Sequence, residues 1–262
     1  MQPVHGIPAL RADEYLVISD LHIGVETHLR SKGFHIASRT DDMMDEIREA
    51  AGTVCSRMIV IGDIKDSVPG STRQEHREVP MFFDRLLEYF DSVDVVRGNH
   101  DTNIEEFLPG RVNIRPASGL RLHDTGFIHG HTWPSSEVMS ADVLVMGHTH
   151  PAVMFKDGIG RMVSEPCWIR GRFKEDADAE RFERLPEEFI VVPAFNRMLG
   201  GSPVNIIGEP LLGPVLNSDL VDLDDATVHL LDGINLGRRI DLMIDGRGPR
   251  AGRGLRRKDV KE

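Results

Sequence analysis

Val17-Ile18-Ser19-Asp20-Leu21-His22 passes from a strand-like apolar run to a carboxylate and an imidazole. The same change occurs at four later places: Val60-Ile61-Gly62-Asp63, Val96-Arg97-Gly98-Asn99-His100-Asp101, Phe127-Ile128-His129-Gly130-His131 and Val145-Met146-Gly147-His148-Thr149-His150. Ligands of open α/β sheets bind beyond the carboxyl ends of the strands. Five such strand ends therefore predict one sheet edge where oxygen and imidazole donors form a metal site.

The composition is that of an ordinary globular protein. Hydrophobic residues make up 40% of the 262 residues and charged residues 28%, a normal balance for a folded soluble chain. We expect no membrane span and no secretion signal, because apolar runs are short and the first 14 residues lack a signal pattern. Cys55 and Cys167 are too few for a disulfide framework. A reduced, cytoplasmic setting is therefore expected.

Charge is unevenly distributed along the chain. The formal net charge is −11, yet residues 245–262 hold seven Lys or Arg and three acidic residues. The acidic remainder argues against a nucleic-acid-binding face spread over the whole protein. The Gly/Arg-rich stretch 245–262 has little apolar surface to bury, so a disordered basic tail is expected. It could be an arm for RNA or DNA, but we favour a solvated terminus.

Strands and helices alternate in the first half of the chain. Apolar runs typical of strands covered on both faces lie at 14–20, 57–63, 93–97, 126–129 and 142–147. Helical patterns fill 38–55 and 71–91, where Ser71 or Thr72 could cap the second helix. This alternation predicts parallel strands joined by helices.

The second half predicts shorter and more closely spaced strands. Residues 112–115, 119–123 and 126–130 suggest strands joined by tight turns, and 152–156 with 161–164 suggest a hairpin around Asp157-Gly158. Further strands fit 188–193, 227–231 and 237–243. We therefore expect one mixed α/β domain over residues 1–244.

The donor set itself favours particular chemistry. Asp20 and Asp63 carry one negative charge each, and the other candidates are histidines and Asn99. Two divalent ions would therefore leave the centre positive, which attracts a phosphate and lowers the pKa of bound water. Nitrogen and oxygen donors without thiolate suit Mn²⁺, which we favour, and also Fe, Zn²⁺ or Ni²⁺.

The order of these motifs resembles the calcineurin-like metallophosphoesterase superfamily. The shared motifs are Asp-x-His, Gly-Asp-x-x-Asp, Gly-Asn-His-Asp, His-Gly and Gly-His-Thr-His, within residues 20–150. Three later segments resemble the ICC-like, SbcD-related phosphoesterases of archaea: Glu165-Pro166-Cys167, Pro193-Ala194-Phe195-Asn196 with Gly200-Gly201, and Leu231-Asp232-Gly233. The resemblance implies a four-layer α-β-β-α sandwich with mixed sheets.

The resemblance also implies roles for individual residues. One metal would take Asp20, His22, Asp63 and His150, and the other would take Asp63, Asn99, His129 and His148, with Asp63 bridging. A metal-activated hydroxide would attack a phosphomonoester or phosphodiester in line. His100, held by Asp101, would stabilise the phosphoryl oxygens or protonate the leaving group. Asp66 departs from the near relatives, which often have His there, so its effect on substrate choice is open.

Several other residues have a functional and a plainer interpretation. His131 and Arg97 could meet substrate, or be a loop histidine and a surface arginine. Glu26 and Arg30 suit a helical ion pair. For Trp133 and Trp168, core or rim packing is favoured over base stacking, and the 193–205 loop suits either a substrate mouth or a tight turn.

Three functions fit these observations. The leading hypothesis is a dinuclear metal-dependent phosphoesterase, with a phosphoester as partner, including a nucleotide or nucleic acid, and no membrane. A DNA nuclease of SbcD type is the second, although only about 110 residues follow His150 and no basic groove is evident. A non-catalytic scaffold is the third, and retention of His100 with every ligand argues against it. Oligomeric state is left open.

Overall fold

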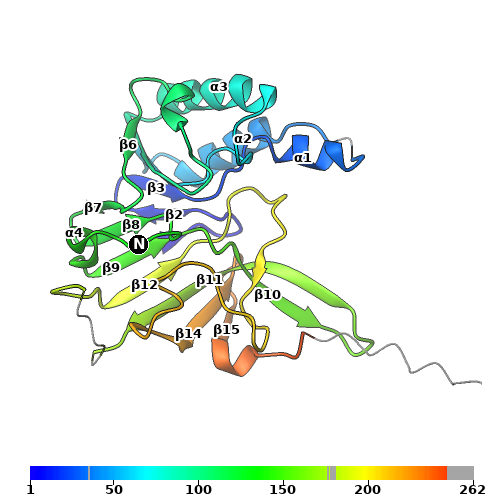
Figure 1. Ribbon diagram of the computed structural model, residues 1–262, viewed down its shortest axis with the longest axis vertical. Coiled ribbons are helices and arrows are strands. Elements are labelled where there is room, and N and C mark those ends of the chain that lie inside the picture. Colours follow the sequence, from blue (N-terminus) through cyan, green and yellow to red (C-terminus); the bar gives the residue numbers. More distant parts are fainter. Residues whose placement is uncertain (35, 176, 178–180, 247–262) are drawn as a thin grey trace, which may run out of the picture.

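Two mixed β-sheets pack face to face in this protein, with helices over the outer face of the first sheet (Figure 1). The computed structural model describes residues 1–34, 36–175, 177 and 181–246. The expected basic tail lies outside the described residues, apart from its first two positions.

The first sheet has six strands, and its later strands run parallel. Their order is β1 (Gln2–Pro3), β2 (Leu10–Ala12), β3 (Tyr15–Ile18), β4 (Arg57–Ile61), β5 (Ser92–Val96) and β6 (Asn113–Arg115). Strands β3 to β6 are parallel, with Val17 opposite Ile59 and Ile59 opposite Asp94. The carboxyl ends of β3, β4 and β5 therefore meet at one edge.

Helices α2 (Thr40–Ala51) and α3 (Arg73–Tyr89) cover this sheet, and the short helix α1 (Val25–Ser31) lies beside α2 (Figure 1). Helices α2 and α3 lie within the ranges expected from the sequence, whereas α1 was indicated only by the spacing of Glu26 and Arg30. Helix α3 begins at a capping box, in which Thr72 and Glu75 each bond the other's backbone N–H. Within the described residues, no helix combines the length and apolarity needed to cross a membrane.

The second sheet is larger and also mixed. Its order is β13 (Ser202–Pro203), β10 (Pro151–Lys156), β11 (Met162–Phe173), β12 (Glu188–Val191), β9 (Val143–Met146), β8 (Thr125–Ile128) and β7 (Leu120–Leu122). Strand β14 (Val221–Leu230) pairs with β11 and carries β15 (Asn235–Arg238). Strands β8, β9 and β12 are parallel, so their carboxyl ends share an edge.

Three apolar layers hold the fold together. Alternate residues of β4 show the division: Met58 and Val60 pack under the helices, whereas Ile59 and Ile61 pack against the second sheet. The outer face of the second sheet is covered by short α4 (Ser136–Met139), η2 (Arg239–Leu242) and the loop with Val215. The expected α/β fold with two mixed sheets is confirmed, and its fourth layer is built from short elements and loops.

Some expected local connections differ from the structure. The strands at 112–115 and 119–123 are not neighbours, because β6 joins the first sheet and β7 the second. The 237–243 run is a short strand followed by the 3-10 helix η2. The hairpin at 152–156 and 161–164 is confirmed, but β11 continues to Phe173 because its second half pairs with β12 and β14.

Candidate metal centre

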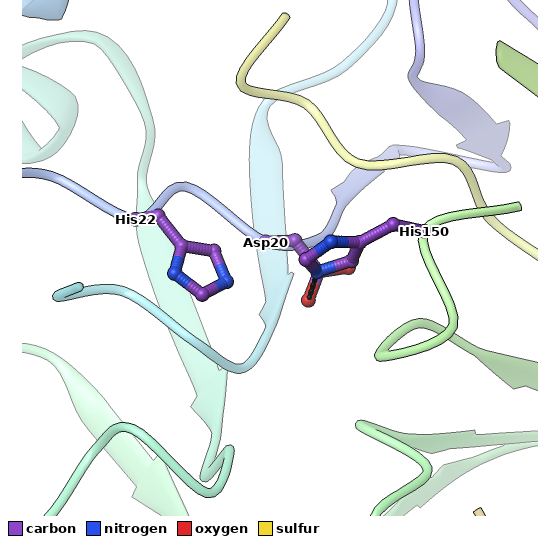
Figure 2. Close-up of side chains that lie close together, drawn as sticks. All are labelled: Asp20, His22 and His150. Carbon is purple, nitrogen blue, oxygen red and sulfur yellow. Dashed lines mark ion pairs between the residues drawn. The ribbon is translucent and has the colours of Figure 1, made fainter. Parts of the chain in front are cut away.

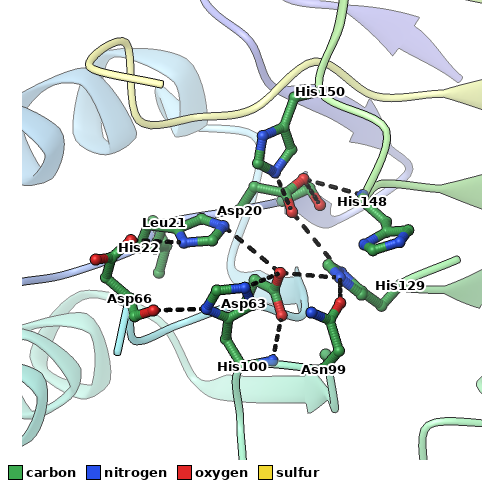
Figure 3. Close-up of polar contacts among 12 residues, drawn as sticks. Asp20, Leu21, His22, Asp63, Asp66, Asn99, His100, His129, His148 and His150 are labelled. Atoms are coloured by element: carbon green, nitrogen blue, oxygen red, sulfur yellow. Dashed lines mark hydrogen bonds and ion pairs between the residues drawn. The ribbon is translucent and has the colours of Figure 1, made fainter. Parts of the chain in front are cut away.

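The structure brings together all seven expected metal ligands and His100 (Figure 3). From the first sheet come the residues that follow β3, β4 and β5, and from the second those that follow β8 and β9. Hydrogen bonds join the two edges: His148 N–H donates to Asp20 Oδ2 at 3.2 Å, and His129 Nδ1 lies 2.9 Å from Ile61 O. The seven ligands are Asp20, His22, Asp63, Asn99, His129, His148 and His150.

The donors form two groups, each with ligand atoms within 4.8 Å of one another. One group is Asp20, His22 and His150, drawn in Figure 2, and the other is Asp63, His129 and His148. His150 Nε2 lies 3.0 Å from Asp20 Oδ1.

Asp63 belongs to the second group but also faces the first. Its Oδ2 is 3.5 Å from His22 Nε2 and 3.2 Å from His129 Nε2. Asn99 Oδ1 lies 3.1 Å from the same nitrogen of His129, so Asn99 joins the second group. This geometry suits a carboxylate shared by two cations.

Five of the seven residues hold a left-handed backbone. The φ angles are 59° at Asp20, 40° at His22, 50° at Asp63, 66° at His148 and 46° at His150. Non-glycine residues pay about 1 kcal/mol each for this conformation, and such residues cluster at functional sites. Sharp turns after the strands therefore aim the side chains at a common point.

Two glycines leave room for the centre. Gly62 has a φ of 75°, and a Cβ there would lie 2.6 Å from His129 Nδ1. At Gly98 a Cβ would collide with the Asp63 carboxylate. Both strand ends therefore require glycine because a side chain would collide with the centre, and Gly62 is required also by its positive φ.

The donor atoms fit a cation because several of them are buried without a hydrogen bond. Among the described residues, Asp20 Oδ1, His22 Nε2 and His150 Nε2 make no hydrogen bond of good geometry, although Asp20 Oδ1 and His150 Nε2 lie 3.0 Å apart. Leaving such atoms unpaired costs about 1–3 kcal/mol each. A divalent ion would satisfy all three atoms at once, and the set of carboxylate, amide and imidazole suits Mn²⁺, Fe, Zn²⁺ or Ni²⁺.

The imidazole rings are held by their Nδ1 atoms. His129 Nδ1 lies 2.9 Å from Ile61 O, and His100 Nδ1 lies 2.6 Å from Asp66 O. A carbonyl oxygen only accepts, so each Nδ1 carries the proton and donates. The Nε2 atom of His129 then faces Asp63 at 3.2 Å, and once it loses its proton its lone pair has the orientation that a metal ligand requires.

The expectation that Asp101 holds His100 is wrong. The buried Asp101 carboxylate accepts hydrogen bonds from Ile64 N–H and Gly98 N–H, both at 2.8 Å. Burial raises the pKa of Asp101, and the nearby charge of Asp63 adds to this, while the two backbone donors lower it. Asp101 therefore ties the loops after β4 and β5 together.

Electrostatics favour an ion pair between a deprotonated Asp63 and a protonated His129. Burial raises the pKa of Asp63, but the hydrogen bond and charge of His129 outweigh it, so the pKa lies well below its usual range. Burial lowers the pKa of His129, but contact with Asp63 and the charge of Asp20 raise it to about 9. Burial and the charge of His129 lower the pKa of His148 to about 4. The His148 ring is thus neutral at pH 7 and can offer a nitrogen lone pair to a metal ion.

Three supporting residues escaped the sequence analysis. Ser19 Oγ donates to Asp20 Oδ2 at 2.5 Å. The buried Lys65 ammonium donates to Ser67 O at 2.8 Å and Gly70 O at 2.9 Å. Buried Glu75 accepts from Asp66 N–H at 3.0 Å. The pattern Thr72-x-x-Glu75, a capping-box signature, could have identified Glu75.

The other residues for which the sequence left a functional role open make structural contacts. Glu26 does not pair with Arg30: its buried carboxylate accepts from Arg39 N–H and Gln74 Nε2. Arg97 pairs with Glu105. Trp168 is buried between the sheets and Trp133 packs against Phe182, so both are packing residues.

His131 and the 193–205 loop lie beside the centre. The His131 ring is 5.3 Å from that of His129, and its buried Nδ1 has no partner among the described residues. Gly200 and Gly201 line a cavity of about 740 Å³ that His150 also lines. The loop therefore frames a cavity at the first donor group.

Residues 14–176 match the calcineurin-like phosphoesterase superfamily domain, and the chain belongs to that superfamily. It is a metallophosphoesterase, a metal-dependent phosphoric ester hydrolase, with two candidate groups of metal ligands. No match to the chain was found among curated proteins.

Several solved structures match the chain at low sequence identity. The nuclease MPE of Pseudomonas putida is 17% identical over 88% of this chain and 95% of its own, with a TM-score of 0.51. The phosphoesterase Yfce of E. coli is 18% identical over 86% and 97% of the two chains, with a TM-score of 0.39. A metallophosphoesterase of Sphaerobacter thermophilus is 13% identical over 88% and 90%, with a TM-score of 0.34. The likeness to the first of these shows the shared fold.

Proposed function

We propose that this protein hydrolyses a phosphomonoester or phosphodiester at a dinuclear metal centre. The ligands of one ion would be Asp20, His22, Asp63 and His150, and those of the other Asp63, Asn99, His129 and His148. The reaction would be an in-line displacement of the leaving oxygen by water at phosphorus.

The position of the Asp63 carboxylate carries this proposal. Its Oδ2 lies 3.5 Å from His22 Nε2 and 3.2 Å from His129 Nε2, so one oxygen faces both donor groups. A carboxylate between two sites of this kind suits a shared ligand. The unpaired buried atoms of the first group support the same interpretation.

The donor set favours Mn²⁺, with Fe, Zn²⁺ or Ni²⁺ as alternatives. When bound, a pair of such ions supplies positive charge to the phosphoryl oxygens and a water of lowered pKa. The protein adds a rigid frame: Asp20, Asp63 and His129 are buried, whereas Asn99 is exposed and His148 and His150 are partly exposed. Substrate would therefore approach from the side of the exposed donors.

His100 is the residue we assign to proton transfer. Its Nδ1 is fixed by Asp66 O at 2.6 Å, and its Nε2 lies 4.0 Å from Asp63 Oδ2. The ring is partly exposed, with 27% of its side chain accessible, so a substrate can reach it. His100 would hold a proton at Nε2 for a phosphoryl oxygen or for the departing oxygen. Asp101 holds the loop that carries His100 by accepting hydrogen bonds from Ile64 N–H and Gly98 N–H.

A nuclease is the second candidate. The solved structure with a TM-score of 0.51 is named as a nuclease, and its substrate is a nucleic acid by that name. A non-catalytic scaffold is less consistent with a complete donor set and a positioned His100.

Hydrolysis of small phosphoesters with Mn²⁺ tests the proposal. The wild type should hydrolyse bis(p-nitrophenyl) phosphate or p-nitrophenyl phosphate, and His100→Ala should lose most activity while keeping its metal. No metal-dependent hydrolysis of any phosphoester would favour the scaffold. Cleavage of single-stranded DNA that outpaces the small diester would favour the nuclease.

Two wider proposals accompany this function. Residues 1–244 would form one domain, since the two sheets share one apolar layer between them. A cytoplasmic setting is proposed because both cysteines are free and buried.

A further inference from the structure

A cavity of about 740 Å³ opens directly beside the first donor group. His150 belongs to both: its ring belongs to the donor group, and the residue lines the cavity. The volume lies within the range of pockets that hold small organic ligands. A phosphoester with its phosphorus at the donor groups would therefore have space here for its organic part.

The cavity wall carries hydrogen-bonding groups with free capacity. Glu165 is exposed on β11, and among the described residues its carboxylate has no hydrogen bond or ion pair. Ser164 Oγ is buried and unpaired within the same part of the chain. Asp232 stands at the turn between β14 and β15, where its Oδ1 accepts from Ile234 N–H at 3.0 Å. Carboxylates accept hydrogen bonds from hydroxyl groups, and sugar hydroxyls are a common partner.

The other walls are largely apolar. They come from the N-terminal segment, the loop after β12 and the end of β14, and include Pro8, Leu199, Leu230 and Leu231. Gly6 N–H donates to Leu231 O at 2.7 Å, which joins two of these walls. Apolar walls suit a flat heterocycle better than a free sugar.

The charge of the cavity disfavours a polyanionic strand. Arg197 is the only Lys or Arg among the described residues that line it. Its guanidinium donates to Glu46 at 3.0 Å and to Gly6 O at 2.8 Å, so its charge is already compensated. Glu165 and Asp232 leave the opening acidic, and phosphates of a longer strand would be repelled there.

We propose that this cavity binds the nucleoside part of a mononucleotide substrate, with Glu165 and Asp232 accepting hydrogen bonds from the ribose hydroxyls. This inference rests on the proposed phosphoester hydrolysis. It narrows the substrate class to nucleotides and assigns the specificity to residues outside the metal ligands. The base would lie against Leu199, Leu230 and Leu231.

Equilibrium dialysis with adenosine, guanosine, cytidine and uridine tests nucleoside binding in the cavity separately from catalysis. These ribonucleosides lack phosphorus, so binding does not require metal or turnover. We expect at least one to bind the full chain at about 1 mM or below. Binding should persist with EDTA, weaken about tenfold in Glu165→Gln and exceed that of the 2′-deoxy compound.

Two tryptophan variants form a matched pair. A Cβ at Gly200 or at Gly158 meets no atom within 4 Å, and neither glycine has a positive φ. Gly200 lines the cavity, whereas Gly158 lies at the tip of the β10–β11 hairpin. Gly200→Trp should abolish nucleoside binding, and Gly158→Trp should leave it unchanged, with both variants matching the wild-type circular dichroism.

The outcomes separate this inference from the proposed function. A wild type that hydrolyses bis(p-nitrophenyl) phosphate but binds no ribonucleoside overturns the cavity assignment alone. A wild type that binds adenosine but hydrolyses no phosphoester overturns the proposed function alone. Glucose binding as tight as adenosine binding, or equal binding by Gly200→Trp, would also contradict the assignment.

Discussion

The backbone carbonyl of Asp66 accepts a hydrogen bond from His100 Nδ1 at 2.6 Å. The carboxylate of the same residue lies 3.2 Å from His22 Nδ1. One loop residue thus orients a ring of the first donor group through its side chain and the proposed proton carrier through its backbone (Figure 3). A substitution of Asp66 removes the side-chain contact with His22 but keeps the backbone contact with His100.

Removal of the Asp66 carboxylate should weaken metal binding. Asp66→Ala leaves His22 without the partner that fixes its ring, and loss of such a partner typically reduces metal affinity 10- to 100-fold. Asp66→Asn keeps an accepting oxygen and should remain near the wild type. Mn²⁺ titration followed by isothermal calorimetry measures both. Equal affinity in wild type and Asp66→Ala would show that this contact does not orient His22.

His100→Gln should reduce turnover without loss of metal. The His100 backbone N–H donates to Asp63 Oδ1 at 2.8 Å, and this contact survives the substitution. Loss of a positioned acid typically costs 10²- to 10⁴-fold in kcat. The loss should be larger for phenyl phosphate than for p-nitrophenyl phosphate, because p-nitrophenolate departs without a proton. An equal loss with both substrates would argue against proton donation.

The sequence predicts which residues meet, because each donor directly follows an apolar run. Asp20, Asp63 and His148 could be assigned to strand ends, and parallel pairing places such ends at one edge. The sequence does not show which atom each ring offers. That choice depends on contacts such as Ile61 O with His129 Nδ1, which join residues 68 positions apart.

The mistaken role of Asp101 has a physical cause. Adjacent residues in sequence suggest adjacent functions, but Asp101 is buried and its two oxygens are used by backbone donors. Likewise, the switch of β6 and β7 between sheets depends on how the two sheets stack, which a local strand pattern does not contain.

Glu75→Ala should destabilise the fold. The fully buried carboxylate accepts from Ser67 N–H at 2.7 Å, Thr72 N–H at 2.5 Å and Asp66 N–H at 3.0 Å. Loss of these bonds leaves buried donors unpaired and should cost about 2–4 kcal/mol of unfolding free energy. Urea denaturation of the metal-free protein measures this cost. The control is Glu49→Ala on exposed α2 surface, and a similar loss there would contradict the assignment.

Metal affinity should rise with pH because a cation must displace the proton of His129. Burial lowers the pKa of His129, but Asp63 and Asp20 raise it to about 9. This pKa lies above the unfolded value, so the proton stabilises the metal-free fold fully below about pH 6.5. That contribution is lost as pH rises through about 9.

Two measurements follow from this linkage. The Tm of EDTA-treated protein should fall between about pH 6.5 and 9, while Mn²⁺ affinity increases over the same range. In His129→Asn, the pH dependence of the Tm and of the Mn²⁺ affinity that comes from His129 should be absent. A pH-independent Mn²⁺ affinity in the wild type would contradict the predicted proton displacement.

The metal content of Asp63→Asn tests the central claim most directly. One oxygen of Asp63 faces both donor groups, so its loss should empty both sites. Wild-type protein reconstituted with Mn²⁺ and desalted should hold two ions per chain by plasma mass spectrometry, and Asp63→Asn should hold none and be inactive. An Asp63→Asn protein that still holds two ions would contradict the shared carboxylate and the dinuclear centre built around it.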